Sequence, residues 1–256
     1  MSSNLTVPTI LTPPPAEVDT PPGPETAAIW VLLTPLLPWL VALPAGPWAL
    51  PLLAPLTVYP AFAARVRERR YGGAWLLAMG WAALLSVGVI TLVAVRPELA
   101  ARGILHGPAY KAEMAGWILT GVGKEATPSA FVPEHLLHLA AFLVLTTVSA
   151  GYLGLALGAF LMAYMSYFVG SFAVASSQPM VGALAAWVPW SVLRVMAFVL
   201  LGALLARPLL VRRRWPFERR EAWLFAFAFA GIAADLALKT LLAPRWGALL
   251  RDLLRS

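Results

Sequence analysis

The chain has 256 residues, of which 60% are hydrophobic and 12% are charged, and its mean hydropathy is +0.77. A soluble globular domain carries roughly a quarter charged residues, so this composition excludes a soluble globule and indicates a polytopic membrane protein. The absence of cysteine excludes disulfides, iron–sulfur clusters and zinc sites built from thiolates. The net charge of +7 comes from arginines in short loops between apolar segments, so no nucleic-acid partner is expected.

Residues 1–26 form a predicted tail that holds seven prolines, three acidic residues and no basic residue. Because proline lacks a backbone N–H and disfavours helix in the residue before it, we expect this tail to be extended and disordered. A signal peptide needs positive charge before its apolar core, whereas the first basic residue here is Arg65. We therefore expect the tail to be retained.

The segment 26–64 is a run of 39 residues without a charge, which is too long for one span of about 20 residues. The sequence Pro-Ala-Gly-Pro at 44–47 interrupts it, so two spans are predicted, at about 27–43 and 47–64. Further prolines fall inside both spans, which favours broken helices. A re-entrant hairpin here is the alternative, and it lowers the expected number of spans from seven to six.

Five further spans are predicted from uncharged runs between charged loops. A turn at residues 176–179 precedes the fourth of them, and Pro244 is expected to end the last. Residues 244–256 place leucines on one face and arginines on the other, which predicts an amphipathic helix at the membrane interface. The predicted fold is therefore all-α, a polytopic bundle of six to seven spans within residues 27–243, with these five spans at about 73–95, 135–157, 158–176, 181–206 and 222–243.

The orientation follows from the basic residues. Ten of the nineteen lysines and arginines lie in two loops, 65–72 and 207–221. The positive-inside rule puts both loops in the cytoplasm, which requires an even number of spans between them, and four are predicted. We therefore expect a protein of the cell (inner, cytoplasmic) membrane, with its N-terminus in the cytoplasm and the segment 96–133 on the outer side.

Two ionisable residues inside predicted spans form the first candidate site. Arg194 lies almost in the middle of its predicted span, and Asp235 lies a few residues past the middle of the last one. Each such charge costs about 2.5–3.5 kcal/mol at the bilayer centre, and the two spans are antiparallel, so the residues are predicted to meet. They form either a structural ion pair or part of a ligand-binding or proton-coupling cavity. Lys239 is predicted to extend its amine to the interface.

The residues Glu134, His135 and His138 form a second candidate site, on one turn at the start of a predicted span. Imidazole and carboxylate groups bind zinc and other divalent metals, and His106 or Glu113 would complete the ligand set. The order of residues differs from the His-Glu-x-x-His motif of zinc proteases, and no distal ligand motif follows. A polar helix cap without metal is the alternative.

Three glycines, Gly151, Gly154 and Gly158, follow each other at spacings of three and four. The last two form a G-x-x-x-G pattern, which lets helix backbones approach closely in lipid. The pattern predicts close packing, either within the bundle or between two copies of the chain.

Three functions remain open, because the chain has neither the Walker A motif nor the nucleophile elbow of the hydrolases. The favoured function is a carrier or permease-type subunit, or a membrane assembly factor, without catalytic residues; its partners are the bilayer and other membrane subunits or a second copy. The second is an intramembrane enzyme that uses a divalent metal at Glu134, His135 and His138. The third is a scaffold or regulator that binds partners through the proline-rich tail.

Overall fold

The computed structural model describes residues 29, 31–42, 46–212 and 218–255, and every regular element in these ranges is helical. The predicted tail, residues 1–26, lies outside them. The elements are η1 (Thr34–Leu36), α2 (Leu37–Ala42), α3 (Ala49–Leu53), η2 (Ala54–Thr57), α4 (Tyr59–Arg67), α5 (Tyr71–Val95), α6 (Pro97–Gly103), α7 (Gly107–Thr120), η3 (Lys124–Ala126), α8 (Pro128–Val148), α9 (Tyr152–Ala175), α10 (Pro179–Ala186), α11 (Pro189–Leu210) and α12 (Arg219–Arg255).

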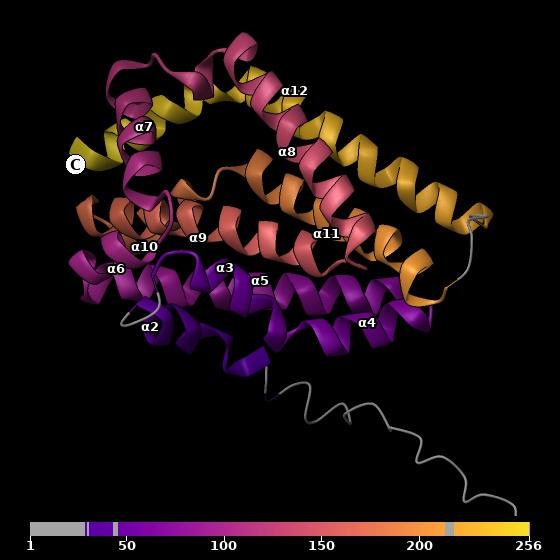
Figure 1. Ribbon diagram of the computed structural model, residues 1–256. Coiled ribbons are helices and arrows are strands. Elements are labelled where there is room, and N and C mark those ends of the chain that lie inside the picture. Colours follow the sequence, from indigo (N-terminus) through magenta and orange to yellow (C-terminus); the bar gives the residue numbers. More distant parts are fainter. Residues whose placement is uncertain (1–28, 30, 43–45, 213–217, 256) are drawn as a thin grey trace, which may run out of the picture.

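Five helices of this described part, α5, α8, α9, α11 and α12, are long and apolar enough to cross a membrane. They form one bundle, which Figure 1 shows from the side. The predicted all-α membrane bundle is therefore confirmed. Prolines start several of its helices, including α8 and α11, because the first helical position needs no backbone donor and its φ suits proline.

Of the six to seven predicted spans, the described residues give five, or six with one bent pair, which agrees with the six-span alternative; the predicted span 27–43 lies only partly within them. The chain from 47 to 64 is not one straight helix, because a bend of 52° separates Ala49–Thr57 from Tyr59–Arg67, and this pair gives a sixth crossing only if it counts as one broken span. In the described part of segment 27–43, η1 and α2 lie along α5. A Cβ at Gly88 of α5 would lie 2.4 Å from the Pro35 carbonyl oxygen, so this glycine permits the close approach.

Three predicted helix boundaries, at 157, 158 and 181, are also wrong. The helix predicted at 135–157 ends at Val148, because Ala150 and Gly151 adopt left-handed φ values of 54° and 95°. The span predicted at 181–206 consists of two helices, since α10 ends at Ala186 and Pro189 starts α11. The long apolar helix therefore starts at Pro189 rather than at residue 181, only five residues before Arg194.

Pro244 does not end the last helix, although it was predicted to do so. The helix α12 continues through it and is 37 residues long in all. At 1.5 Å per residue this is about 55 Å, well beyond the roughly 30 Å of a hydrocarbon core. Beyond Pro244 the helix packs on protein: Leu250 is fully buried, and Arg251 Nε donates to the Ile118 carbonyl of α7 at 2.7 Å. The predicted interfacial helix is therefore the last part of α12.

The bundle has two different ends. At the first, which we call the capped end, α6, α7, η3 and α10 cover the long helices (Figure 1, left). At the second, the basic end, the stretch 65–70 after α4 meets the start of α12, because Arg69 pairs with Glu218. Buried Glu221 accepts a hydrogen bond there from Tyr71 and another, at 3.3 Å, from Arg207. Four long helices separate these two segments in the sequence.

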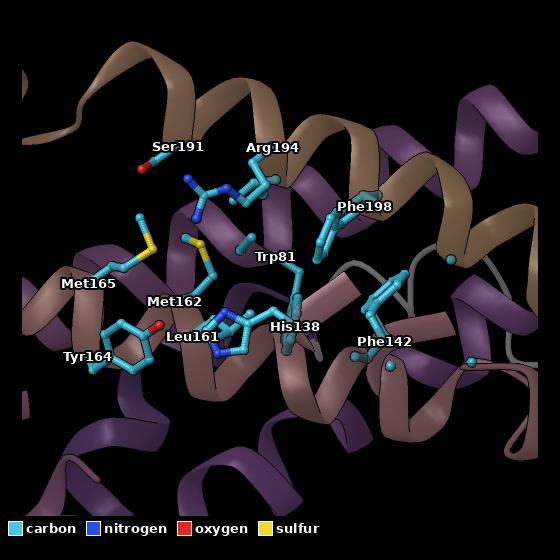
Figure 2. Close-up of a pocket in the computed structure, with 18 of the residues that line it drawn as sticks. Trp81, His138, Phe142, Leu161, Met162, Tyr164, Met165, Ser191, Arg194 and Phe198 are labelled. Atoms are coloured by element: carbon cyan, nitrogen blue, oxygen red, sulfur yellow. The ribbon is translucent and has the colours of Figure 1, made fainter. Parts of the chain in front are cut away.

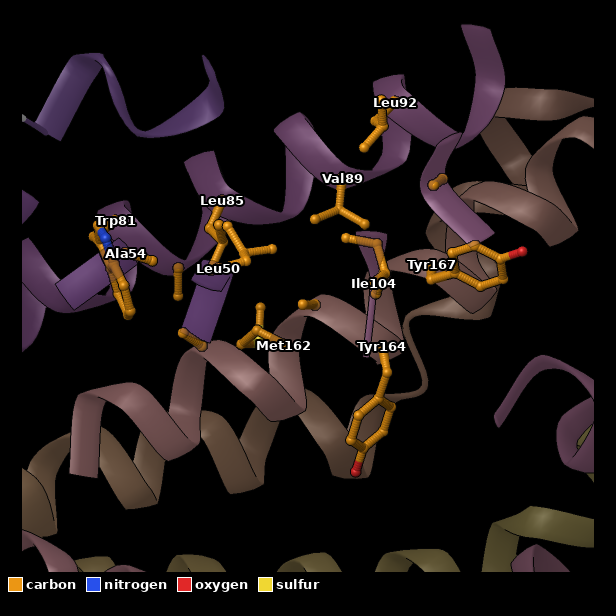
Figure 3. Packing of buried hydrophobic residues seen from close by; sticks show 14 of the residues in the cluster. Leu50, Ala54, Trp81, Leu85, Val89, Leu92, Ile104, Met162, Tyr164 and Tyr167 are labelled. Atoms are coloured by element: carbon orange, nitrogen blue, oxygen red, sulfur yellow. The ribbon is translucent and has the colours of Figure 1, made fainter. Parts of the chain in front are cut away.

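The helices α5 and α9 form the wall of the bundle behind the candidate site (Figure 3). Leu85 and Val89 of α5 pack with Met162 of α9 in one buried cluster. The Ser166 hydroxyl donates to the Ser86 hydroxyl at 2.9 Å, which satisfies two buried polar groups between these helices. Tyr164 extends from this cluster with its hydroxyl directed away from α5 (Figure 3).

Candidate functional site

Arg194 and Asp235 form a two-pronged ion pair between α11 and α12. Arg194 Nε lies 2.8 Å from one carboxylate oxygen and Nη2 lies 3.0 Å from the other, and the Asp235 side chain is 1% exposed. Because α11 begins at Pro189, Arg194 lies in the second turn of its helix, near the capped end. Its predicted place in the middle of a span is therefore wrong. The pair joins two neighbouring helices through charge-assisted hydrogen bonds.

A second buried ion pair follows one turn further along α12. Lys239 Nζ lies 2.9 Å from Glu125 Oε1 in η3, and its side chain is 2% exposed. The same ammonium lies 4.5 Å from the centre of the Phe131 ring, within reach of a cation–π interaction. The predicted extension of Lys239 to the interface is wrong, because the capped end brings a carboxylate to it. Glu125 was not among the predicted site residues.

A third group of charges lies nearer to solvent. Lys124 Nζ is 3.4 Å from a carboxylate oxygen of Glu113 and 3.4 Å from one of Glu134. These two carboxylates, Glu134 first, raise the pKa of Lys124 above its usual value. On α7 beside them, burial raises the pKa of the Tyr110 hydroxyl well above its usual value, and Glu125 adds to this shift. The aromatic ring of Tyr110 packs on Tyr164 of α9 at 4.7 Å between centroids.

The structure does not assemble Glu134, His135 and His138 into a metal site. Glu134 is bound to Lys124, and His135 Nδ1 donates to the Phe131 carbonyl at 2.8 Å while its Nε2 lies 4.0 Å from Asp235. Among the described residues, no three side chains of the metal-binding types lie close enough together to hold an ion. The two further ligands proposed from the sequence are engaged elsewhere: Glu113 pairs with lysine and His106 packs on a tyrosine ring.

Two cavities adjoin at these residues. The first, which we call the slot, has a volume of about 80 Å³ and lies between α5, α8, α9 and α11 (Figure 2). The second, which we call the vestibule, has a volume of about 30 Å³ and lies at the capped end among the charged side chains described above. Five residues line both cavities: His135, His138, Tyr164, Met165 and Arg194.

The three glycines have different roles. Gly151 forms the left-handed turn, where a Cβ would lie 2.9 Å from the Ala206 side chain. Gly154 contacts α8, since a Cβ there would lie 2.1 Å from Thr146 Oγ1. Gly158 has no atom within 4 Å of its Cβ position and lines the slot. Within the bundle, Gly151 and Gly154 therefore allow close packing as predicted, whereas Gly158 leaves open space beside it.

The comparisons with family models, with curated proteins and with solved structures each found no match for this chain. The function is therefore argued from the two cavities and the residues between them.

Proposed function

We propose that this membrane protein is a carrier or permease-type protein that binds its ligand where the slot meets the vestibule. One observation carries the proposal: an apolar cavity between the long helices adjoins a charged cavity at the capped end, and two histidines, a tyrosine, a methionine and an arginine line both. Ligand sites between the helices of a bundle combine apolar walls with a few polar groups in this way.

The placement of the charged side chains supports a path for a ligand through the bundle rather than a core closed to solvent. The vestibule reaches partly exposed side chains, because Lys124 is 50% and Glu134 is 43% exposed. The slot extends from the vestibule towards the basic end, where Gly151 and Gly202 line it. We place the basic end in the cytoplasm by the positive-inside rule, so the vestibule faces the outer side. A ligand between the two cavities is then within reach of opposite faces of the membrane, as alternating access requires.

The two other functions have less support. An enzyme that uses a divalent metal needs ligands brought together, and the described part of the chain gathers none. Partner binding through residues 1–26 concerns a segment outside the described residues. An assembly factor without a ligand shares the bundle but has no use for the adjoining cavities, so accessibility of the cavities separates it from a carrier.

Accessibility can be tested with the cysteine-free chain. Met165 lines both cavities, so Met165→Cys in sealed vesicles is expected to react with a membrane-impermeant thiol reagent added from either side. Ala112→Cys, on the exposed surface of α7, is the control and is expected to react from one side only. Failure of Met165→Cys to react from either side would favour an assembly or scaffold role. Reaction from one side alone would indicate a binding protein without passage.

A further inference from the structure

Three polar groups at the junction of the two cavities have no hydrogen-bonding partner among the described residues. They are the His138 ring, the Tyr164 hydroxyl and the Ser191 hydroxyl, and all three line the slot. Figure 2 shows these side chains around one opening, with Arg194 beside them. A hydroxyl group and a neutral imidazole ring can each donate and accept a hydrogen bond. Because buried polar groups are normally satisfied, this part of the slot suits a molecule that also does both.

The charged side chains at the junction are already paired with one another. Arg194 Nε and Nη2 lie against the two carboxylate oxygens of Asp235, and Lys239 Nζ lies 2.9 Å from Glu125. A charged ligand would lose its water at the junction without gaining a free counter-charge, which makes its binding unfavourable. The paired charges therefore favour an uncharged ligand.

One unbalanced negative charge lies at the rim of the vestibule, away from this junction. Lys124 is 3.4 Å from Glu113 and 3.4 Å from Glu134, so two carboxylates share one ammonium group. The three side chains are between 29% and 50% exposed, so water and salt screen this charge. The rim therefore does not set the charge of a ligand bound at the junction.

The volume of the slot limits the size of the ligand. The slot measures about 80 Å³. A water molecule needs roughly 10–15 Å³ of such space, so the slot has room for about five to eight groups of that size. Away from the junction its lining is apolar, with Phe142, Leu155 and Phe198 as examples. These walls suit a short apolar group of a few carbon atoms.

We infer that the ligand is a small uncharged molecule of about five to seven non-hydrogen atoms, with a hydroxyl or carboxamide group at one end. This polar group exchanges hydrogen bonds with His138, Tyr164 and Ser191, and the apolar end lies in the slot. The inference rests on the proposed function, in which the same cavities bind the transported ligand, and it adds the chemical class of that ligand. Gly158 keeps the slot open, because it lines the slot and no atom lies within 4 Å of its Cβ position.

Three planar probes of nearly equal size test the class: neutral propionamide, negative propionate and positive propionamidinium. Each is titrated against the purified full chain carrying Met165→Cys, and the rate of reaction with methyl methanethiosulfonate is measured in detergent. Met165 lines both cavities, so a bound probe shields the cysteine. Propionamide is expected to slow the reaction at least about tenfold at saturation, when the site is empty less than about a tenth of the time. Each charged probe is expected to need at least about tenfold more for the same effect.

Two results would overturn the inference. One is protection by either charged probe at the concentration that suffices for propionamide. The other is protection by none of the three, since the cavities would then hold water only. Ala112→Cys, on the exposed surface of α7, is the control and should react at one rate with every probe. The rise in Tm of the unmodified chain with each probe gives the same ranking without the cysteine.

Two variants locate the bound probe. Tyr164→Phe combined with Ser191→Ala removes two hydrogen-bonding groups and keeps every charge, so the half-protecting concentration of propionamide is expected to rise about tenfold. Tyr167→Phe is the control, because Tyr167 lies on the same helix and lines neither cavity. Gly158→Leu fills the slot and is expected to abolish the effect of propionamide on the rate and on Tm. Gly80→Leu should leave both effects unchanged, because Gly80 is exposed on α5 and also has no atom within 4 Å of its Cβ position. Unchanged affinity in Tyr164→Phe/Ser191→Ala and in Gly158→Leu would place the probe elsewhere and refute the inference.

The outcomes separate this inference from the proposed function. If Met165→Cys reacts from both sides of the membrane but propionamide does not protect it, the carrier function stands and the ligand class is wrong. If propionamide protects as expected but Met165→Cys reacts from one side only, the binding site stands without transport.

Discussion

Removing one member of the Arg194–Asp235 pair should destabilise the fold far more than removing both. Asp235 is 1% exposed and receives two hydrogen bonds from the guanidinium, so either single change leaves a buried charge without its partner. Loss of one partner of a buried pair costs about 3–5 kcal/mol. For a chain of this size, about 2–4 °C of Tm is lost per kcal/mol. Arg194→Met or Asp235→Leu alone should therefore lower Tm by about 6–20 °C.

The double variant Arg194→Met with Asp235→Leu should recover most of that loss, because two apolar side chains replace a desolvated pair. Tm is measured in detergent from tryptophan fluorescence, and the four proteins complete a double-mutant cycle. Lys124→Ala is the control: its pairs are half exposed, so its Tm should change by no more than about 3 °C. Additive losses in the double variant, or single variants within 3 °C of the unmodified chain, would refute the reasoning.

Four further predictions follow from the same packing and charges. Lys239→Met should lower Tm by several degrees, because it leaves the Glu125 carboxylate buried, and Tm in detergent measures this. Gly154→Ala should lower Tm while Gly158→Ala leaves it unchanged, since a methyl group at 154 would lie 2.1 Å from a threonine hydroxyl and one at 158 meets nothing. A chelator should leave Tm unchanged if the chain binds no structural metal; a fall in Tm on chelation would contradict the geometry of the histidines. Ala112→Cys should react with an impermeant reagent only from the side opposite to the basic loops.

The sequence predicts the pairing of Arg194 with Asp235 because a charge inside an apolar span needs a partner. The predicted spans that contain these two residues are antiparallel and bring their opposite charges to a similar depth in the membrane. Glu125 could not be found in this way. It lies in a polar segment, where a carboxylate is ordinary, and only the fold of η3 against α12 brings it to Lys239.

Helix boundaries were predicted less well, because one residue type acts differently in different contexts. Pro189 starts a helix, as proline at a first helical position does. Pro244 lies within a helix that continues, and membrane helices tolerate such prolines when neighbours satisfy the freed backbone groups. Of the three glycines near residue 150, only Gly151 makes the turn, and its left-handed φ is not visible in the spacing.

The length of α12 has a mechanical consequence. Glu221 fixes one end of this helix to Tyr71 and Arg207, and Lys239 lies eighteen residues further along, or about 27 Å away. A rigid rod that pivots at Glu221 by about 5° moves Lys239 by about 2 Å, enough to break its bond to Glu125. Both buried ion pairs of α12, Asp235 with Arg194 and Lys239 with Glu125, lie far from its Glu221 end, so a small rotation there displaces them most. A small rotation of α12 about its Glu221 end would therefore be enough to separate Lys239 from Glu125 at the capped end, with no change in the helix itself.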